Sequence, residues 1–230
     1  MFLSSLALLS ADATTVVTWI SVGAVIVLFA VIALICFKGQ KKYDAKHIAF
    51  AGLTVGLSFA LSFAKFSFVN NGGSVTIASM VPLLIYAYFY GVIDGLLAGA
   101  IFGLLNFLSG PWLLTPMTFL LDYPLAYASI GLMGFAGKVL KEKPTLSVTL
   151  FVLLVYAVRF CFHLFSGVIY FMENEICVEE FPEWALSGPF VYSFIYQCLY
   201  LPADCAITLG VMIPLTKTRT LDRLCNFMKK

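Results

Sequence analysis

Charge is the scarcest property of this sequence. Only 11% of its 230 residues are Asp, Glu, Lys or Arg, whereas 61% are hydrophobic. A soluble domain of this length does not need so much apolar side chain to build its core. The low charge therefore excludes an ordinary soluble fold and predicts a chain that spans a lipid bilayer. The basic residues form no continuous binding face, so we expect no nucleic-acid partner.

Several sequence motifs of catalysis and metal binding are also missing. The six cysteines include no C-x-x-C pair, which argues against a zinc site and a disulfide framework. No G-x-x-x-x-G-K-[ST] is present, so any energy from ATP has to be supplied by another protein. Neither G-x-S-x-G nor H-E-x-x-H occurs, which argues against an enzyme. We expect no metal and no cofactor.

Long apolar runs predict an all-α membrane protein with seven spanning segments. We place them at about 15–37, 48–64, 77–90, 95–108, 117–137, 146–171 and 187–215. The third and fourth are short for a bilayer core of ~30 Å, so we expect them to tilt or to form a hairpin that crosses only partly. We expect Pro202 to break the last segment.

The spans divide the chain into three parts. Residues 1–44 are predicted to hold an extra N-terminal transmembrane helix and a basic linker, 45–218 a helical domain, and 219–230 a basic cytoplasmic tail. The first residues, 1–13, lack the basic region of a signal peptide. We therefore treat 15–37 as a spanning helix rather than a cleaved leader.

The distribution of basic residues predicts the orientation. With seven crossings, every one of the 14 lysines and arginines except Lys65 and Arg159 falls on the same side as the 38–46 cluster. The glutamates of 173–183 fall on the other side. Because cytoplasmic loops carry an excess of Lys and Arg, the C-terminus is predicted to be cytoplasmic and the N-terminus outside. The protein is expected to be a multi-pass protein of the bacterial plasma membrane.

Polar side chains inside the spans predict a pocket. Counting ~1.5 Å per helical residue from the outer ends places Asp122, His163 and Gln197 in the outer half of the membrane. Aromatic residues share this depth: Tyr123, Tyr127, Tyr170, Phe171, Tyr192, Tyr196 and Tyr200. A desolvated carboxylate and aromatic faces both attract cations. The pattern favours an outward-facing pocket for a small, polar, aromatic cation.

Other roles are open for each of these residues. Asp122 could cap a helix, His163 could bond a neighbouring helix, and Gln197 could join two helices. The tyrosines could form an interfacial aromatic belt.

Deeper in the membrane, Arg159 and Asp204 are expected to form a structural ion pair, since pairing lowers the free energy of a buried charge. Gly52 and Gly56, four residues apart, could let another helix approach closely.

Several segments together resemble one family of membrane proteins. They are Ala60-Leu61-Ser62-Phe63, Gly72-Gly73-Ser74 with Met80-Val81-Pro82, Tyr90-Gly91-x-x-x-Gly95, Leu121-Asp122-Tyr123-Pro124-Leu125-Ala126-Tyr127, Arg159-Phe160-x-x-His163-x-x-x-Gly167 and Tyr192-Ser193-x-x-Tyr196-Gln197. The chain is similar over about 47–215 to the thiamine-specific substrate-binding (S) components of energy-coupling factor (ECF) transporters. The resemblance implies a six-helix bundle, here with one extra N-terminal helix.

The resemblance also implies roles for particular residues. Asp122 stands where the family has a glutamate facing the cationic ligand, and His163 where a histidine stacks on it. Gly52 and Gly56 match a small-x-x-x-small motif that contacts the coupling subunit. Phe171 and Gln197 replace a tryptophan and an asparagine, and Trp112 is a candidate cover for the site. The implied substrate contacts are Asp122, Tyr123, His163, Tyr170, Phe171, Tyr192, Tyr196, Gln197 and Trp112.

The function implied is high-affinity capture of thiamine outside the cell. Thiamine would be released inside by a complex with a transmembrane coupling subunit and two ATPase subunits, after the pocket has closed under the 66–76 segment. One alternative is an S component for another vitamin or a pyrimidine. The others are a stand-alone secondary transporter and an intramembrane enzyme that uses Asp122 and His163 as acid and base.

Overall fold

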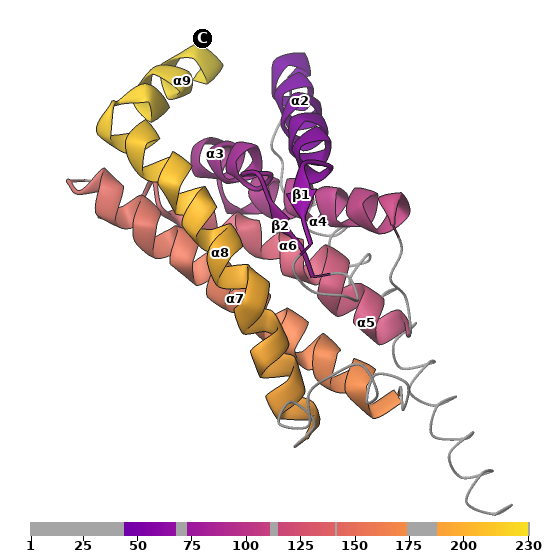
Figure 1. The fold of residues 1–230 in the computed structure, drawn as a ribbon. Helices are drawn as coiled ribbons and strands as arrows, with labels where there is room; N and C mark the ends of the chain where they lie inside the picture. Colours follow the sequence, from indigo (N-terminus) through magenta and orange to yellow (C-terminus); the bar gives the residue numbers. More distant parts are fainter. Residues whose placement is uncertain (1–43, 68–72, 111–114, 141, 174–187, 230) are drawn as a thin grey trace, which may run out of the picture.

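The protein is a helical bundle with one short β-hairpin. The computed structural model describes residues 44–67, 73–110, 115–140, 142–173 and 188–229. Its main helices are α2 (Ala45–Ser62), α3 (Val81–Tyr90), α4 (Val92–Ser109), α7 (Pro144–Glu173), α8 (Pro189–Lys217) and α9 (Thr220–Lys229), as Figure 1 shows. Strands β1 (Lys65–Phe66) and β2 (Val75–Thr76) pair antiparallel, with Lys65 opposite Thr76.

Four of the described helices are long and apolar enough to cross a membrane: α2, α4, α7 and α8. Helix α3 is apolar but has only 10 residues, and only Gly91, with φ of 102°, separates it from α4. Helix α3 fits the predicted short third span, whereas the fourth is longer than predicted, because α4 has 18 residues and is long enough to cross. The predicted first span, 15–37, lies outside the described residues.

The predicted fifth span is a helix of changing pitch. It consists of α5 (Pro116–Leu120), a π-helical turn η1 (Leu121–Leu125), α6 (Ala126–Ala128) and a 3-10 segment η2 (Ser129–Phe135). Pro124 lies inside the π-helical turn and has no backbone N–H to donate. Wider turns of this kind are often found at functional sites, and this one carries Asp122.

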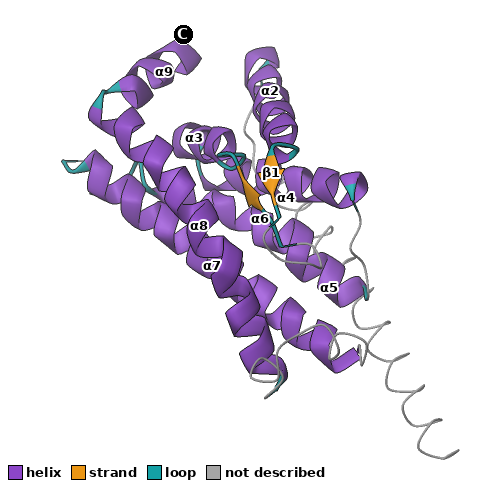
Figure 2. Ribbon diagram, in the orientation of Figure 1, coloured by secondary structure: helices purple, strands orange, loops and turns teal. Residues whose placement is uncertain are grey.

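The core lies where these elements pack against one another. Helices α7 and α8 pack extensively side by side, and α4 packs against the η1–η2 run (Figures 1 and 2). The largest fully buried side chains are all apolar apart from Thr208 and include Phe102, Met80, Leu83, Leu84, Ile130 and Met133. Large apolar side chains such as Leu53, Leu108 and Phe165 are exposed, as expected of a surface that faces lipid.

Two predictions about the helices are wrong: the break in the last span and the start of the third. Helix α8 runs without interruption from Pro189 to Lys217 although Pro202 and Pro214 lie inside it. Membrane helices tolerate proline because the surrounding protein stabilises the few backbone groups that it leaves unpaired. The third span begins at Val81 rather than 77, because Val75 and Thr76 form a strand and Ala78 has φ of 58°, which no right-handed helix allows.

Glycines on α4 let the η1–α6 backbone approach it directly. A Cβ built at Gly99 would lie 2.1 Å from the Tyr127 carbonyl oxygen, and one at Gly103 would lie 2.4 Å from that of Tyr123.

We expect Gly103→Ala to lower the free energy of unfolding by about 2 kcal/mol, as overpacking does. Thermal unfolding in detergent measures this. Gly210→Ala is the matched control, because no described atom lies within 4 Å of a Cβ there; equal stability of the two variants would contradict the prediction.

Candidate ligand-binding site

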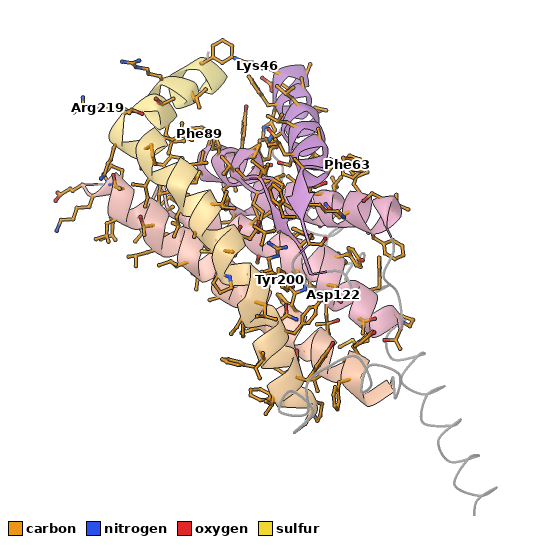
Figure 3. All side chains as sticks on the ribbon, viewed as in Figure 1. Lys46, Phe63, Phe89, Asp122, Tyr200 and Arg219 are labelled. Carbon is orange, nitrogen blue, oxygen red and sulfur yellow. The ribbon has the colours of Figure 1, made fainter. Side chains whose placement is uncertain are left out.

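A cavity of about 230 Å³ opens among α5–η1, α7, α8 and the hairpin. Its lining is polar and aromatic. The residues are Lys65, Gly73, Gly110, Thr118, Asp122, Tyr123, His163, Ser166, Gly167, Tyr170, Tyr192, Tyr196, Gln197 and Tyr200. Figure 3 shows the labelled Asp122 and Tyr200 close together in the lower half of the view, whereas Lys46 and Arg219 lie at its upper end.

Most of the residues predicted to bind the substrate line this cavity. The structure brings together Asp122, Tyr123, His163, Tyr170, Tyr192, Tyr196 and Gln197. Phe171 does not line it but packs on Tyr192, with the ring centroids 5.1 Å apart. Trp112 lies outside the described residues. Sequence reasoning did not propose Ser166 or Thr118; Ser166 follows His163 by three residues, a spacing that places both on one helix face.

The local sequence explains how Asp122 is positioned. Thr115 caps α5 by accepting a hydrogen bond from the Thr118 N–H. Pro116 occupies the first helical turn, where a backbone N–H has no partner within the helix, so its missing N–H costs no hydrogen bond. The helix therefore starts at a fixed point, two turns before Asp122. The π-helical turn then widens the backbone there. Together they direct the carboxylate toward α7.

Asp122 is held by two residues of α7. Its Oδ1 lies 2.8 Å from His163 Nδ1, and its Oδ2 accepts a hydrogen bond of 2.5 Å from the Ser166 hydroxyl. Arg159 Nε donates to His163 Nε2 at 3.3 Å. Since arginine can only donate, Nε2 is the accepting nitrogen and the proton is on Nδ1. His163 is thus a neutral ring whose Nδ1 donates to Asp122.

Beneath this pair lies a buried network around Asp204. Arg159 Nη1 is 3.1 Å from Asp204 Oδ2, so the two charges expected to pair do form an ion pair. The Tyr156 hydroxyl donates to the same oxygen at 2.8 Å. Thr76 reaches Asp204 Oδ1 through its N–H, at 3.0 Å, and its hydroxyl, at 2.9 Å. Asp204 therefore joins α7, α8 and strand β2.

Gln197 and two tyrosines complete the α8 wall. Gln197 Nε2 donates to the His163 carbonyl oxygen at 3.2 Å, and its Oε1 accepts from the Tyr200 hydroxyl at 2.5 Å. Gln197 therefore joins α7 and α8 while it also lines the cavity. The Gly73 N–H donates to the Tyr196 hydroxyl at 2.7 Å, which attaches the end of the hairpin loop to α8.

Acidic side chains outnumber cationic ones in this network. Asp122 and Asp204 are acidic, His163 is neutral, and Arg159 is the one cation bonded to them in the described structure. Within this bonded group two acidic side chains face one guanidinium, and Asp122, with a quarter of its side chain accessible, is the acidic group open to the cavity, whose wall also contains Lys65. The Asp122 carboxyl group and the tyrosine rings around it are groups that attract cations.

The same residues are poorly suited to other chemistry. No group of three or more His, Cys, Asp or Glu residues that could hold a metal ion occurs within the described residues. The cysteines described, Cys161, Cys198 and Cys205, are free thiols.

A second, apolar cavity of about 450 Å³ lies between α2 and α4. Gly52 and Gly56 line it, together with Ala51, Val55, Ala98 and Ile101. Among the described residues, no atom lies within 4 Å of a Cβ built at either glycine. The two small residues thus face an open groove rather than the packed interior.

The fold and the site define a helical membrane protein with a polar, aromatic cavity. Comparison identifies its family: residues 48–223 match the model of the family Thiamine transporter protein (Thia_YuaJ), and the chain belongs to that family. It is 31% identical over 154 residues to thiamine transporter ThiT of Bacillus subtilis (strain 168), covering 62% of this chain and 76% of the relative.

A solved structure of ThiT from Listeria monocytogenes has the same fold. It aligns with a TM-score of 0.61 at 18% identity, over 76% of this chain and 96% of the Listeria chain. The described helices are therefore arranged as in that protein. The resemblance seen in the sequence motifs is confirmed at the level of the family and the fold.

Proposed function

We propose that this chain is the thiamine-binding S component of an ECF-type importer. It captures thiamine with high affinity on the outer side of the plasma membrane and delivers it inward when coupled to a transmembrane subunit and two ATPases. The observation that carries the proposal is an accessible aspartate side chain, Asp122, inside a cavity lined by tyrosines. Thiamine is an aromatic cation, and the Bacillus subtilis relative is named as a thiamine transporter.

The arrangement of charges supports the proposed orientation. Lys46 and Arg219 lie at the end of the bundle away from Asp122 (Figure 3). If the basic end is cytoplasmic, as the positive-inside rule favours, the cavity lies toward the outside. Thiamine then reaches Asp122 from the outer surface, and the C-terminal helix α9 lies at the cytoplasmic surface.

Calorimetric titration of the purified full chain with thiamine tests the binding. We expect saturable binding of one thiamine per chain, and no binding would contradict the proposal.

Uptake into liposomes separates an S component from a stand-alone transporter. The chain alone should not accumulate thiamine, whereas the complex with its coupling subunit and ATPases should do so when ATP is present.

The α2–α4 groove is the proposed contact for the coupling subunit. We expect Gly56→Leu to weaken assembly with that subunit about tenfold or more, since a larger side chain that overpacks a close contact costs about 1–3 kcal/mol. Thiamine binding should not change, because Gly56 is not part of the binding cavity. Co-purification with the coupling subunit measures assembly. Gly210→Leu is the control on α8, and equal assembly of the two variants would contradict this assignment.

A further inference from the structure

The α2–α4 groove follows one face of α2 from the first turn of that helix. On α2 it is lined by His47, Ile48, Ala51, Gly52, Val55 and Gly56. Helix α2 is also the least buried of the four described candidate spans, with 22% of its apolar window buried against 33% or 39% in the others. An open apolar groove beside a sparsely covered helix is a surface on which a further apolar helix packs.

The apolar run 15–37 is tethered at the mouth of this groove. It is long enough to span a bilayer, and only residues 38–43 separate it from Asp44, the N-cap of α2. A linker of this length reaches at most about 25 Å when fully extended. The near end of the run therefore lies within that distance of His47 and Ile48, where the groove begins. Such a short tether gives the run an effective concentration on the order of millimolar at the groove.

Small residues of the two segments fall at matching depths. A run that crosses from the outside to the cytoplasm lies antiparallel to α2. Gly52 lies seven residues after the start of α2, and Ala30 lies seven residues before the end of the run, so each is ~10 Å from the cytoplasmic end of its segment. Gly23, Ala30 and Ala33 are spaced by seven and three residues, which places them on one helix face. Small residues on both sides let two membrane helices approach closely.

We propose that residues 15–37 pack as a helix in the α2–α4 groove of their own chain, with Ala30 against Gly52. The segment then covers the surface that the proposed function assigns to the coupling subunit, so segment and subunit compete for one groove. A partner that binds only the uncovered groove has its apparent affinity reduced by the fraction of time that the groove is covered. The packing does not depend on the proposed function, whereas the competition rests on it.

Disulfide cross-linking of the full chain in membranes tests the packing. Ala30→Cys is combined with Gly52→Cys, and mass spectrometry of the linked peptides separates this disulfide from any that involves a natural cysteine. We expect an intramolecular disulfide, because helices in contact at small residues bring their Cβ atoms within the ~4 Å that a disulfide needs. Leu53→Cys in place of Gly52→Cys is the matched control, since Leu53 is 66% exposed and does not line the groove.

Two further pairs cover a shift of one helical turn: Ile26→Cys and Ala33→Cys, each combined with Gly52→Cys. A disulfide from any of the three pairs, without one to Leu53→Cys, supports the packing. No disulfide from any pair, or equal yields with Gly52→Cys and Leu53→Cys, would overturn it. A disulfide between two chains would overturn it as well and would assign the groove to a second copy.

Co-purification with the coupling subunit tests the competition. Ala30→Leu adds bulk to the face that packs on α2, so we expect the coupling subunit to assemble about fivefold more tightly or better as the groove becomes uncovered. Ala24→Leu is the matched control, because it makes the same change on the opposite face of the segment. Equal assembly of these two variants, or a disulfide that persists in the assembled complex, would overturn the competition. If the disulfide forms but no coupling subunit binds the wild-type chain or either variant, the proposed function fails and the packing stands.

Discussion

Asp122→Asn is expected to weaken thiamine binding about 100-fold or more. Two opposite charges 4 Å apart attract by about 4 kcal/mol at an effective dielectric constant of 20, and part of this is offset by easier desolvation of the neutral site. Asparagine keeps the size of the side chain and an oxygen that can accept from His163 Nδ1. The fold should therefore be retained, and calorimetric titration measures the change in Kd.

Asp122→Glu is the matched control for this charge. It retains the carboxylate and restores the residue type that the family resemblance places at this position. We expect its Kd to lie within about tenfold of the wild-type value, since one added methylene shifts the carboxylate without removing it. A wild-type Kd in the Asn variant would remove the charge of Asp122 from the mechanism. A loss as large in Glu as in Asn would assign the effect to geometry instead.

The sequence was sufficient to predict which helices contribute to the site. Charges and amides in apolar runs are rare, and the depth of each follows from its distance to the end of its run. This reasoning placed Asp122, His163 and Gln197 at one level, and all three line one cavity. It also paired Arg159 with Asp204, because these are the charges deepest in the spans.

The bonds within the site could not be predicted in this way. The expected stacking of His163 on the ligand stays a prediction; what the sequence did not indicate is that the ring lies between Arg159 and Asp122, bonded to both. The alternative that Gln197 joins two helices also holds, because it bonds the His163 carbonyl oxygen while lining the cavity. Each contact depends on the rotation of one helix against another, and the spacing of residues along a single helix does not determine that rotation.

Irregular backbone was the other feature that sequence patterns missed. The π-helical turn at Leu121–Leu125 lies within one longer run, and no sequence pattern distinguishes a π-helical turn there from an α-helical one that contains a proline. Strands of two residues are too short for any alternating pattern. The hairpin is stabilised instead from a distance of more than 100 residues, because Asp204 accepts both hydrogen bonds from Thr76.

Arg159→Met is expected to lower the free energy of unfolding more than the other variants do, by about 3–5 kcal/mol. This is the range found when one partner of a buried ion pair is removed. Asp204 would keep Tyr156 and Thr76 as donors but lose its counter-ion. The His163 Nε2 atom would lose its donor as well. Thermal unfolding in detergent measures the loss, and Arg223→Met, at an exposed arginine of α9, is the matched control.

The double variant Arg159→Met, Asp204→Leu distinguishes the two roles of this ion pair. Removing both charges leaves no buried charge unpaired, so most of the stability should return. Thiamine binding should nevertheless remain weak, because Thr76 then has no carboxylate to hold strand β2 and His163 is still without its donor. Recovery of both stability and binding would show that the pair only compensates charge. Recovery of stability alone would show that Arg159 and Asp204 also position the hairpin and the histidine at the thiamine site.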